Sequence, residues 1–322
     1  MSKANRVALT ASLPRRGLPQ LPGVAWLLLA LLLGLSAVAP GFASAANALN
    51  VAQQATLLLL LALPMTLIVM TEGLDLSMGA SLSLCTVVLA VVSLGSGSLA
   101  LGIAAALLAA VLIGLLNGVL IAWLELPPFV ATLGTLGVAQ GLALVLAEGR
   151  STSGVGDGLA TLWNGAVMGL PVPLLFAAAA WGLFHVLLHH TRFGVAVIAL
   201  GGNREALKLA GMNERGSLIA VYALGGLFVG LAALLLGARL GGGHPTAAIG
   251  MEFDAIAAVA VGGTLFERGK GSLGGTVLGV LAVGVMRNGL NLLSMPSSLQ
   301  VAAVGAVVIV ALVVDALRGQ QH

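Results

Sequence analysis

The sequence predicts an all-α polytopic membrane protein, and three observations support this fold class. Of 322 residues, 59% are hydrophobic and only 8% are charged, whereas charged residues approach a quarter of an ordinary soluble domain. Several apolar stretches reach the roughly 20 residues that a helix needs to cross about 30 Å of hydrocarbon. The 45 glycines are typical of membrane helices that pack closely against each other. An ordinary soluble domain is therefore excluded.

We expect about ten transmembrane helices in two weakly similar halves, within one transmembrane domain at 21–317. The tails at 1–20 and 318–322 should lie in the cytoplasm, as should the loop 191–216. The segments at 78–95 and 253–266 are the least regular, and the second is short enough to be a re-entrant or half-length helix. The expected spans are 22–40, 51–71, 78–95, 98–124, 127–147, 171–190, 217–240, 253–266, 272–293 and 298–317.

Basic residues orient this bundle, because cytoplasmic loops carry an excess of Lys and Arg. With ten spans and both termini inside, eleven of the fourteen basic residues face the cytoplasm, while Arg150 and Arg239 lie outside and Arg287 lies within a span. The apolar run after Arg15 and Arg16 is slightly long for a signal peptide, so an uncleaved first helix is favoured. No basic cluster with interleaved aromatic residues indicates nucleic-acid binding.

The two halves of the chain share a weak pattern. Residues 76–80 and 271–275 both follow a charged turn and open a helix of small residues. Repeated halves with interrupted spans are typical of transport proteins whose path lies between the repeats. If the repeats are inverted, the turns at 72–77 and 267–271 should approach opposite faces or meet near mid-depth. A simple ten-span drawing instead places both turns inside.

One long charged loop, residues 191–216, contains a short helix with good capping signals. Asn203 is a favoured N-cap, and Glu205 suits the first turn. Lys208 lies towards the end of the helix, where Gly211 can close it in a left-handed conformation. Two turns of helix are marginal alone in water. We therefore expect this helix to contact a soluble partner outside the bilayer.

Asp75 and Ser77 interrupt a long apolar stretch near the start of the third span. An acidic side chain at a helix centre costs roughly 2.5–3.5 kcal/mol on insertion scales, so this turn must be solvated or paired. One interpretation is a gate or cavity-lining turn beside a translocation path. The other is that either side chain simply caps the following helix, and both interpretations can hold together.

A second polar stretch lies within the ninth expected span. Arg287 and Asn291 are four residues apart and share a helix face, and Asn288 lies between them. They either line a water-filled path, or Arg287 extends to the interface while the asparagines bond to neighbouring helices. Asn117, on another span, is a further candidate for the path or a polar packing residue.

The sequence offers no candidate for a metal site, a phosphate-binding loop or a disulfide. His185 and His189 have the i, i+4 spacing of metal ligands, but they fall at the end of a span and no acidic residue or cysteine lies near them. We expect them at the membrane interface, with no metal. Gly269-Lys270 fails as a phosphate loop, because residue 264 is Thr and Gly follows the Lys. The single Cys85 excludes an internal disulfide.

Four motifs in order resemble the ribose-type ABC sugar permeases, and the resemblance covers residues 45 to 316. It implies a type II ABC importer-like subunit of the bacterial inner membrane that translocates a monosaccharide by alternating access, with no enzymatic activity and no cofactor of its own. Glu72 departs from the family pattern, which commonly has a small residue there, and Arg287 replaces a smaller residue. The motifs lie at 72–83, 201–212, 254–271 and 287–293.

The resemblance also implies partners. These are cytoplasmic ABC ATPase subunits, a second permease chain (identical or paralogous), a periplasmic sugar-binding protein and membrane lipid. The short helix then resembles the family's coupling helix. Alternatives are an ABC permease for a branched-chain amino acid or another small polar solute, and a secondary transporter that works alone. The residues expected to couple to the ATPase are Gly201, Gly202, Asn203, Glu205, Ala206, Lys208 and Gly211.

Overall fold

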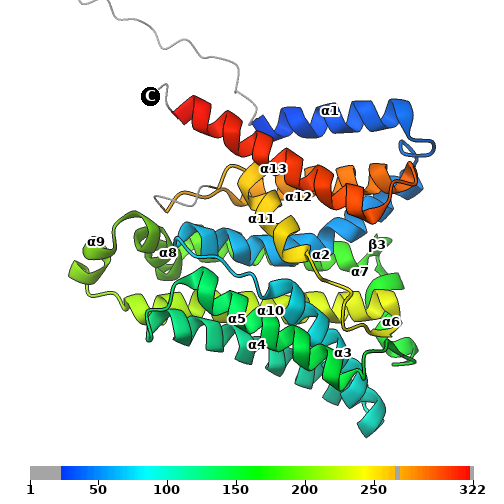
Figure 1. Ribbon diagram of the computed structural model, residues 1–322, viewed down its shortest axis with the longest axis horizontal. Helices are drawn as coiled ribbons and strands as arrows, with labels where there is room; N and C mark the ends of the chain where they lie inside the picture. Colours follow the sequence, from blue (N-terminus) through cyan, green and yellow to red (C-terminus); the bar gives the residue numbers. More distant parts are fainter. Residues whose placement is uncertain (1–22, 265–268, 320–322) are drawn as a thin grey trace, which may run out of the picture.

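A computed structural model describes residues 23–264 and 269–319, which form a bundle of α-helices with two very short strand pairs (Figure 1). The expected N-terminal tail, residues 320–322 and positions 267–268 of the expected second turn lie outside the described residues. The helices are α1 (Gly23–Val38), α2 (Ala45–Met70), α3 (Met78–Ser96), α4 (Leu99–Ala122), α5 (Pro128–Leu146), α6 (Asp157–Asn164), α7 (Val172–His190), α8 (Arg192–Gly202), α9 (Arg204–Leu209), α10 (Glu214–Leu240), α11 (Met251–Val261), α12 (Leu273–Leu292) and α13 (Ser297–Gly319).

Seven helices in the described part of the chain are long and apolar enough to cross a membrane: α2, α3, α4, α5, α7, α10 and α12. The prediction of an all-α, multi-pass membrane protein is therefore confirmed. The other expected spans correspond to α1, α11 and α13. α1 has only 16 residues and α11 only 11, so neither reaches the roughly 20 residues of a full span by itself.

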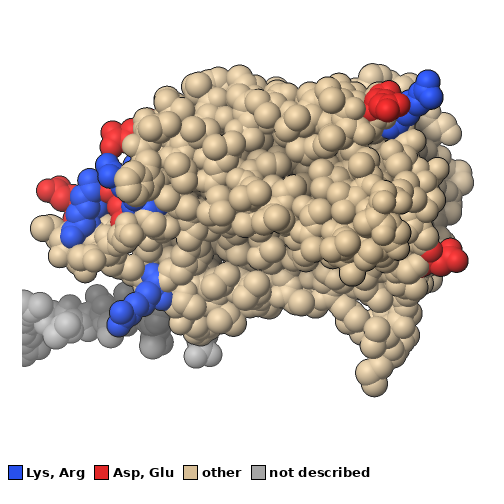
Figure 2. All heavy atoms as spheres, turned by 90° about the horizontal axis from the view of Figure 1, so that it is seen from below, with Lys and Arg blue, Asp and Glu red and all other residues tan. Residues whose placement is uncertain are grey.

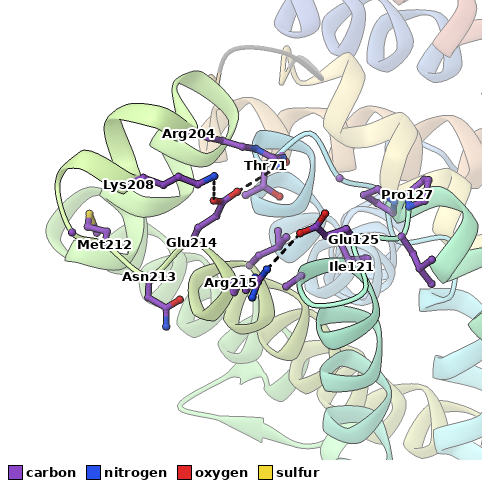
Figure 3. Close-up of a pocket in the computed structure, with 16 residues that line it drawn as sticks. Thr71, Ile121, Glu125, Pro127, Arg204, Lys208, Met212, Asn213, Glu214 and Arg215 are labelled. Atoms are coloured by element: carbon purple, nitrogen blue, oxygen red, sulfur yellow. Dashed lines mark hydrogen bonds and ion pairs between the residues drawn. The ribbon is translucent and has the colours of Figure 1, made fainter.

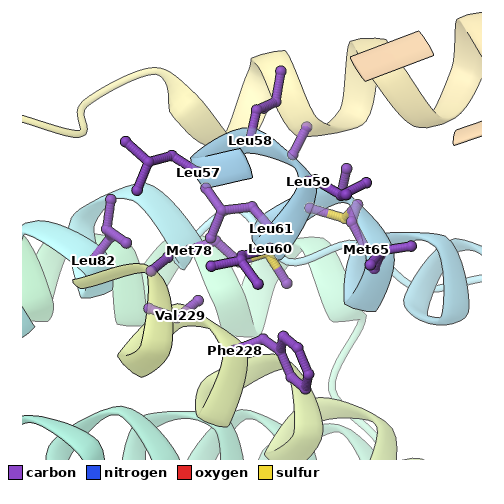
Figure 4. Packing of buried hydrophobic residues seen from close by; sticks show 14 of the residues in the cluster. Leu57, Leu58, Leu59, Leu60, Leu61, Met65, Met78, Leu82, Phe228 and Val229 are labelled. Carbon is purple, nitrogen blue, oxygen red and sulfur yellow. The ribbon is translucent and has the colours of Figure 1, made fainter. Parts of the chain in front are cut away.

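α2 forms the centre of the bundle, and α7, α10, α11 and α12 pack around it. Its buried run extends from Ala55 to Met70, with Leu60, Leu61 and Leu63 fully buried. A helix that is apolar on all sides either faces lipid or is covered by neighbouring helices, and α2 is covered along most of its length. Figure 4 shows Leu60 and Leu61 close to Met78 of α3 and to Phe228 and Val229 of α10.

Small residues let the surrounding helices approach each other. A Cβ atom on Gly114 of α4 would overlap the backbone of Tyr222 and Gly226 on α10, and one on Gly279 of α12 would overlap the Ala258 carbonyl on α11. These two glycines therefore serve packing within the chain. Lipid tails are as apolar as the helices, so close backbone packing, and not the hydrophobic effect, favours their association.

On the face that Figure 2 shows, charged side chains gather at the two ends of the molecule, with a broad uncharged band between them. One end carries α8 and α9, and we call it the α9 end. The other carries two strand pairs, β1 (Thr152–Ser153) with β4 (Gly242–Gly243) and β2 (Ala166–Val167) with β3 (Leu170–Pro171). An uncharged band between polar ends suits a bundle that spans a bilayer.

Two segments without helix lead into the bundle, and both border α3. One is the turn 71–77, which follows α2, and the other is 244–250, which follows β4. Ser83 of α3 accepts a hydrogen bond from the Ala248 amide at 3.1 Å, and a Cβ on Gly79 would overlap the Ala248 carbonyl and Glu252. The described residues of the second expected turn, 269–271, lie against α8 and the Met70 end of α2, which is the end of α2 where the turn 71–77 begins.

Candidate functional site

The loop 191–216 contains two helices where the sequence predicted one. Thr191 caps α8 through a hydrogen bond from the Gly194 amide at 3.3 Å, and α9 follows directly. Expecting α9 alone was wrong because α8, rich in glycine and alanine, has few charges to mark it as a separate amphipathic helix. α8 is fixed by tertiary contact: Gly201 is buried so closely against the Met70 carbonyl that a Cβ there would overlap it.

Both predicted caps of α9 are confirmed. The Asn203 side chain accepts a hydrogen bond from the Ala206 amide at 2.8 Å, and Gly211 has a φ of +70°. The Gly211 amide donates to the Lys208 carbonyl at 3.0 Å, and the Met212 amide donates to the Leu207 carbonyl at 3.2 Å. These two bonds form a Schellman motif, which satisfies the last carbonyls of the helix.

α9 has one buried side and one exposed side. Leu207 is 2% exposed and packs against Ala196 and Leu200 of α8. Glu205 and Lys208 are exposed, and Leu209 is 84% exposed. α9 is therefore held by a single buried leucine and presents both charged and apolar side chains outward.

An ion-pair network attaches α9 to its surroundings (Figure 3). Arg204 lies between two carboxylates, 3.6 Å from Glu72 and 3.7 Å from Glu214, and Lys208 lies 3.2 Å from Glu214. Arg204 also donates to the Thr71 carbonyl at 3.4 Å. The network borders a cavity of about 870 Å³ that α9, the start of α10 and the α4–α5 connection enclose.

Three of the predicted path residues form one buried cluster. Asp75 accepts hydrogen bonds from the amide and the hydroxyl of Ser77, at 2.9 and 2.6 Å. The Asn117 amide nitrogen donates to the Ser77 hydroxyl at 2.9 Å, and its oxygen accepts from Thr135 at 2.6 Å. Ser77 occupies the N-cap position of α3 without a capping hydrogen bond from its side chain. The carboxylate therefore fixes the turn instead of capping α3.

The other three predicted path residues lie apart from that cluster. Arg287 forms an ion pair with Asp254 of α11, with 2.6 Å between the guanidinium and the carboxylate. Asn288 and Asn47 exchange two hydrogen bonds at 2.9 Å, which join α12 to α2. Asn291 is exposed. Arg287, Asn288 and Asn291 thus have different neighbours, and the six candidate path residues do not form one site in the described structure.

Residues 47–312 match the family described as branched-chain amino acid transport system / permease component. The chain belongs to this permease family. The ribose import permease protein of Bacillus subtilis is 37% identical over 86% of this chain and 86% of its own length. The L-arabinose ABC transporter permease protein of Azospirillum brasilense is 30% identical over 93% and 88%.

A third relative of this permease is the D-allose transport system permease protein of Escherichia coli K12, which is 34% identical over 77% of each chain. The resemblance to ribose-type ABC permeases that the four motifs indicated is therefore confirmed. No solved structure matches the chain.

Sequence reasoning missed two acidic residues of this permease. Asp254 was noted only as part of a motif, yet it is the partner of Arg287. Glu252, 3% exposed, accepts hydrogen bonds from the Gly250 amide. A usable signal was present, because an acidic residue in a short apolar helix requires a partner. Among the described residues no group of three or more His, Cys, Asp and Glu could hold a metal.

Proposed function

We propose that this permease is the transmembrane subunit of an ATP-driven ABC importer, which translocates a monosaccharide across the bacterial inner membrane by alternating access. The observation that carries the proposal is α9, a capped helix with one buried leucine and an outward surface that includes Leu209. An apolar side chain that protrudes among charges at the end of a membrane bundle suits docking against a second protein. The names of three relatives, which specify ribose, D-allose and L-arabinose, support a sugar as cargo.

The α8–α9 surface is the proposed site of coupling to the ATPase. ATP hydrolysis then belongs to a separate cytoplasmic subunit, and this chain is not an enzyme. A second permease chain, a copy or a paralogue, completes the path, and a periplasmic binding protein delivers the sugar. The coupling residues are Gly201, Gly202, Asn203, Glu205, Ala206, Lys208 and Gly211.

The turn 71–77 is the proposed gate. Because Asp75 is 3% exposed in this chain, its role is to hold the turn with Ser77 and Asn117, and the backbone of the turn faces the path. Three polar residues of α12 remain candidates for lining the path opposite this turn: Arg287, Asn288 and Asn291.

We further propose ten crossings, with both termini in the cytoplasm. Seven are the long apolar helices, and the others are α1, α13, and α11 together with segment 244–250. Figure 1 shows the axes of α1, α12 and α13 roughly aligned with one another. An even number of crossings returns the chain to its starting side, here the α9 end. That end carries an excess of basic residues, as cytoplasmic surfaces do: Arg192, Arg204, Lys208, Arg215 and Lys270.

Reconstitution tests the function directly. The permease is placed in proteoliposomes with its ATPase and binding protein, and uptake of radiolabelled ribose, D-allose and L-arabinose is measured with ATP and with a non-hydrolysable analogue. We expect uptake of at least one sugar only with ATP. Uptake without any ATPase would contradict the proposal and favour a secondary transporter.

A branched-chain amino acid is the second candidate cargo, because the family description names it. Competition decides between the two classes: excess unlabelled leucine should leave sugar uptake unchanged. If labelled leucine accumulates with ATP and none of the three sugars does, the cargo class is wrong while the ABC mechanism stands.

A further inference from the structure

Arg204 is the side chain of α9 that reaches the turn 71–77. Its guanidinium lies 3.6 Å from the Glu72 carboxylate and within hydrogen-bond distance of the Thr71 carbonyl. The same guanidinium lies 3.7 Å from Glu214 at the start of α10, and Lys208 shares that carboxylate. Through one arginine, α9 therefore contacts both the helix that follows it and a segment 132 residues earlier in the chain.

Glu72 has an unusual backbone conformation. Its φ is +63°, a left-handed value that residues other than glycine rarely adopt. Such conformations persist where the surroundings hold them, and they gather at segments that switch. The contact with Arg204 is thus made by a residue whose strained backbone must be held by its surroundings.

A movement at Glu72 would reach the buried Asp75 cluster directly. The residue after Glu72, Gly73, lies so close to the Tyr222 hydroxyl that a Cβ would overlap it. The Tyr222 hydroxyl donates to the Leu74 carbonyl at 3.3 Å, and Asp75 follows with its bonds to Ser77. Each residue from 72 to 75 is therefore held by a side chain or by close packing, so the turn transmits displacement along its length.

We infer that the Glu72–Arg204 pair positions the gate: it is the contact through which α9 moves the turn 71–77 when the ATPase moves α9. This inference rests on the proposed coupling role of α9. Exposed ion pairs contribute little to folding stability, and both side chains are nearly half exposed. The pair therefore serves the transmission of movement, and its removal should spare the fold while it weakens coupling.

A double-mutant cycle tests the inference in the reconstituted transporter with its ATPase and binding protein. The variants are Glu72→Gln, Arg204→Gln and both together, and the readout is sugar transported per ATP hydrolysed. The matched control is the cycle of Glu125→Gln and Arg215→Gln. Glu125 also has a positive φ, +53°, and lies 3.5 Å from Arg215. This pair lines the same cavity but joins the α4–α5 connection to α10, and among the described residues it has no ion pair or side-chain hydrogen bond with α9 or the turn 71–77.

We expect Glu72→Gln to lower sugar transported per ATP roughly two- to fivefold, as the loss of one exposed pair allows. The double variant should be no worse than Arg204→Gln alone, because residues that act through each other are non-additive. The inference is overturned if Glu72→Gln transports normally, if the two losses multiply, or if the control pair loses as much. Gly211→Val distinguishes failure of this inference from failure of the proposed coupling role of α9. If Gly211→Val uncouples transport from ATP hydrolysis while Glu72→Gln does not, α9 remains the coupling helix and only the role of the Glu72–Arg204 pair is refuted.

Discussion

Gly211→Val is the sharpest test of the role of α9, because it changes one backbone conformation and nothing else nearby. Gly211 has a φ of +70°, and a Cβ at this position would meet no atom within 4 Å. A clash of the added Cβ atom with the bundle is therefore excluded. The effect of valine comes only from the left-handed conformation, which costs an L-residue roughly 1–2 kcal/mol, with β-branched side chains at the unfavourable end.

That cost is large for a helix of this size. α9 has six residues, and helices this short are marginal without tertiary support. A loss of about 2 kcal/mol changes the ratio of formed to unformed helix roughly 30-fold. Leu207 is the one fully buried anchor among the side chains of α9, so the helix should unwind while the bundle around α2 remains folded.

The assay compares Gly211→Val with Gly211→Asn in proteoliposomes. Asparagine tolerates the left-handed conformation better than other residues with a Cβ, so it serves as the matched control. We expect the valine variant to lose most sugar transport per ATP and the asparagine variant to retain most of it, at equal membrane levels. Equal transport by the valine variant and the wild type would refute the reasoning, and an equal loss in both variants would show that the left-handed conformation is not the cause.

Three further predictions concern the clusters and the topology. Arg287→Met should lower the free energy of unfolding by about 3 kcal/mol, the low end of the cost of breaking a buried ion pair, because Arg287 is one-third exposed. Thermal unfolding in detergent measures this loss, and adding Asp254→Leu should recover most of it. If the double variant recovers none of the loss, the two side chains do not act as a pair. Asp75→Leu should reduce uptake at a normal membrane level and Asp75→Asn should reduce it less, whereas a change in expression alone would support a structural role for the turn. Leu209→Cys, with Cys85→Ser, should react with an impermeant maleimide in inside-out vesicles only; reaction in right-side-out vesicles would reverse the orientation.

Local features of α9 were predictable because they depend on residues close in sequence. The N-cap bond joins residues three apart, and the closing bonds at Gly211 span no more than five residues. α8 was not predictable, since its position depends on close backbone packing of Gly201 against the end of α2, 131 residues earlier. The predicted path residues lie in separate clusters for the same reason: which of them come together depends on contacts between residues far apart in the sequence.

Composition and apolar run length determined the membrane-embedded helical fold, because the hydrocarbon core imposes the same length and polarity on every span. Sequence motifs determined the family, and local capping signals determined α9. The tertiary structure decided which polar groups pair: Arg287 with Asp254 across 33 residues, Asn288 with Asn47 across 241, and Arg204 with Glu72. A charged or amide side chain in an apolar bundle must find a partner, but which partner it finds depends on which helices become neighbours, and side-chain periodicity along one helix does not contain that information.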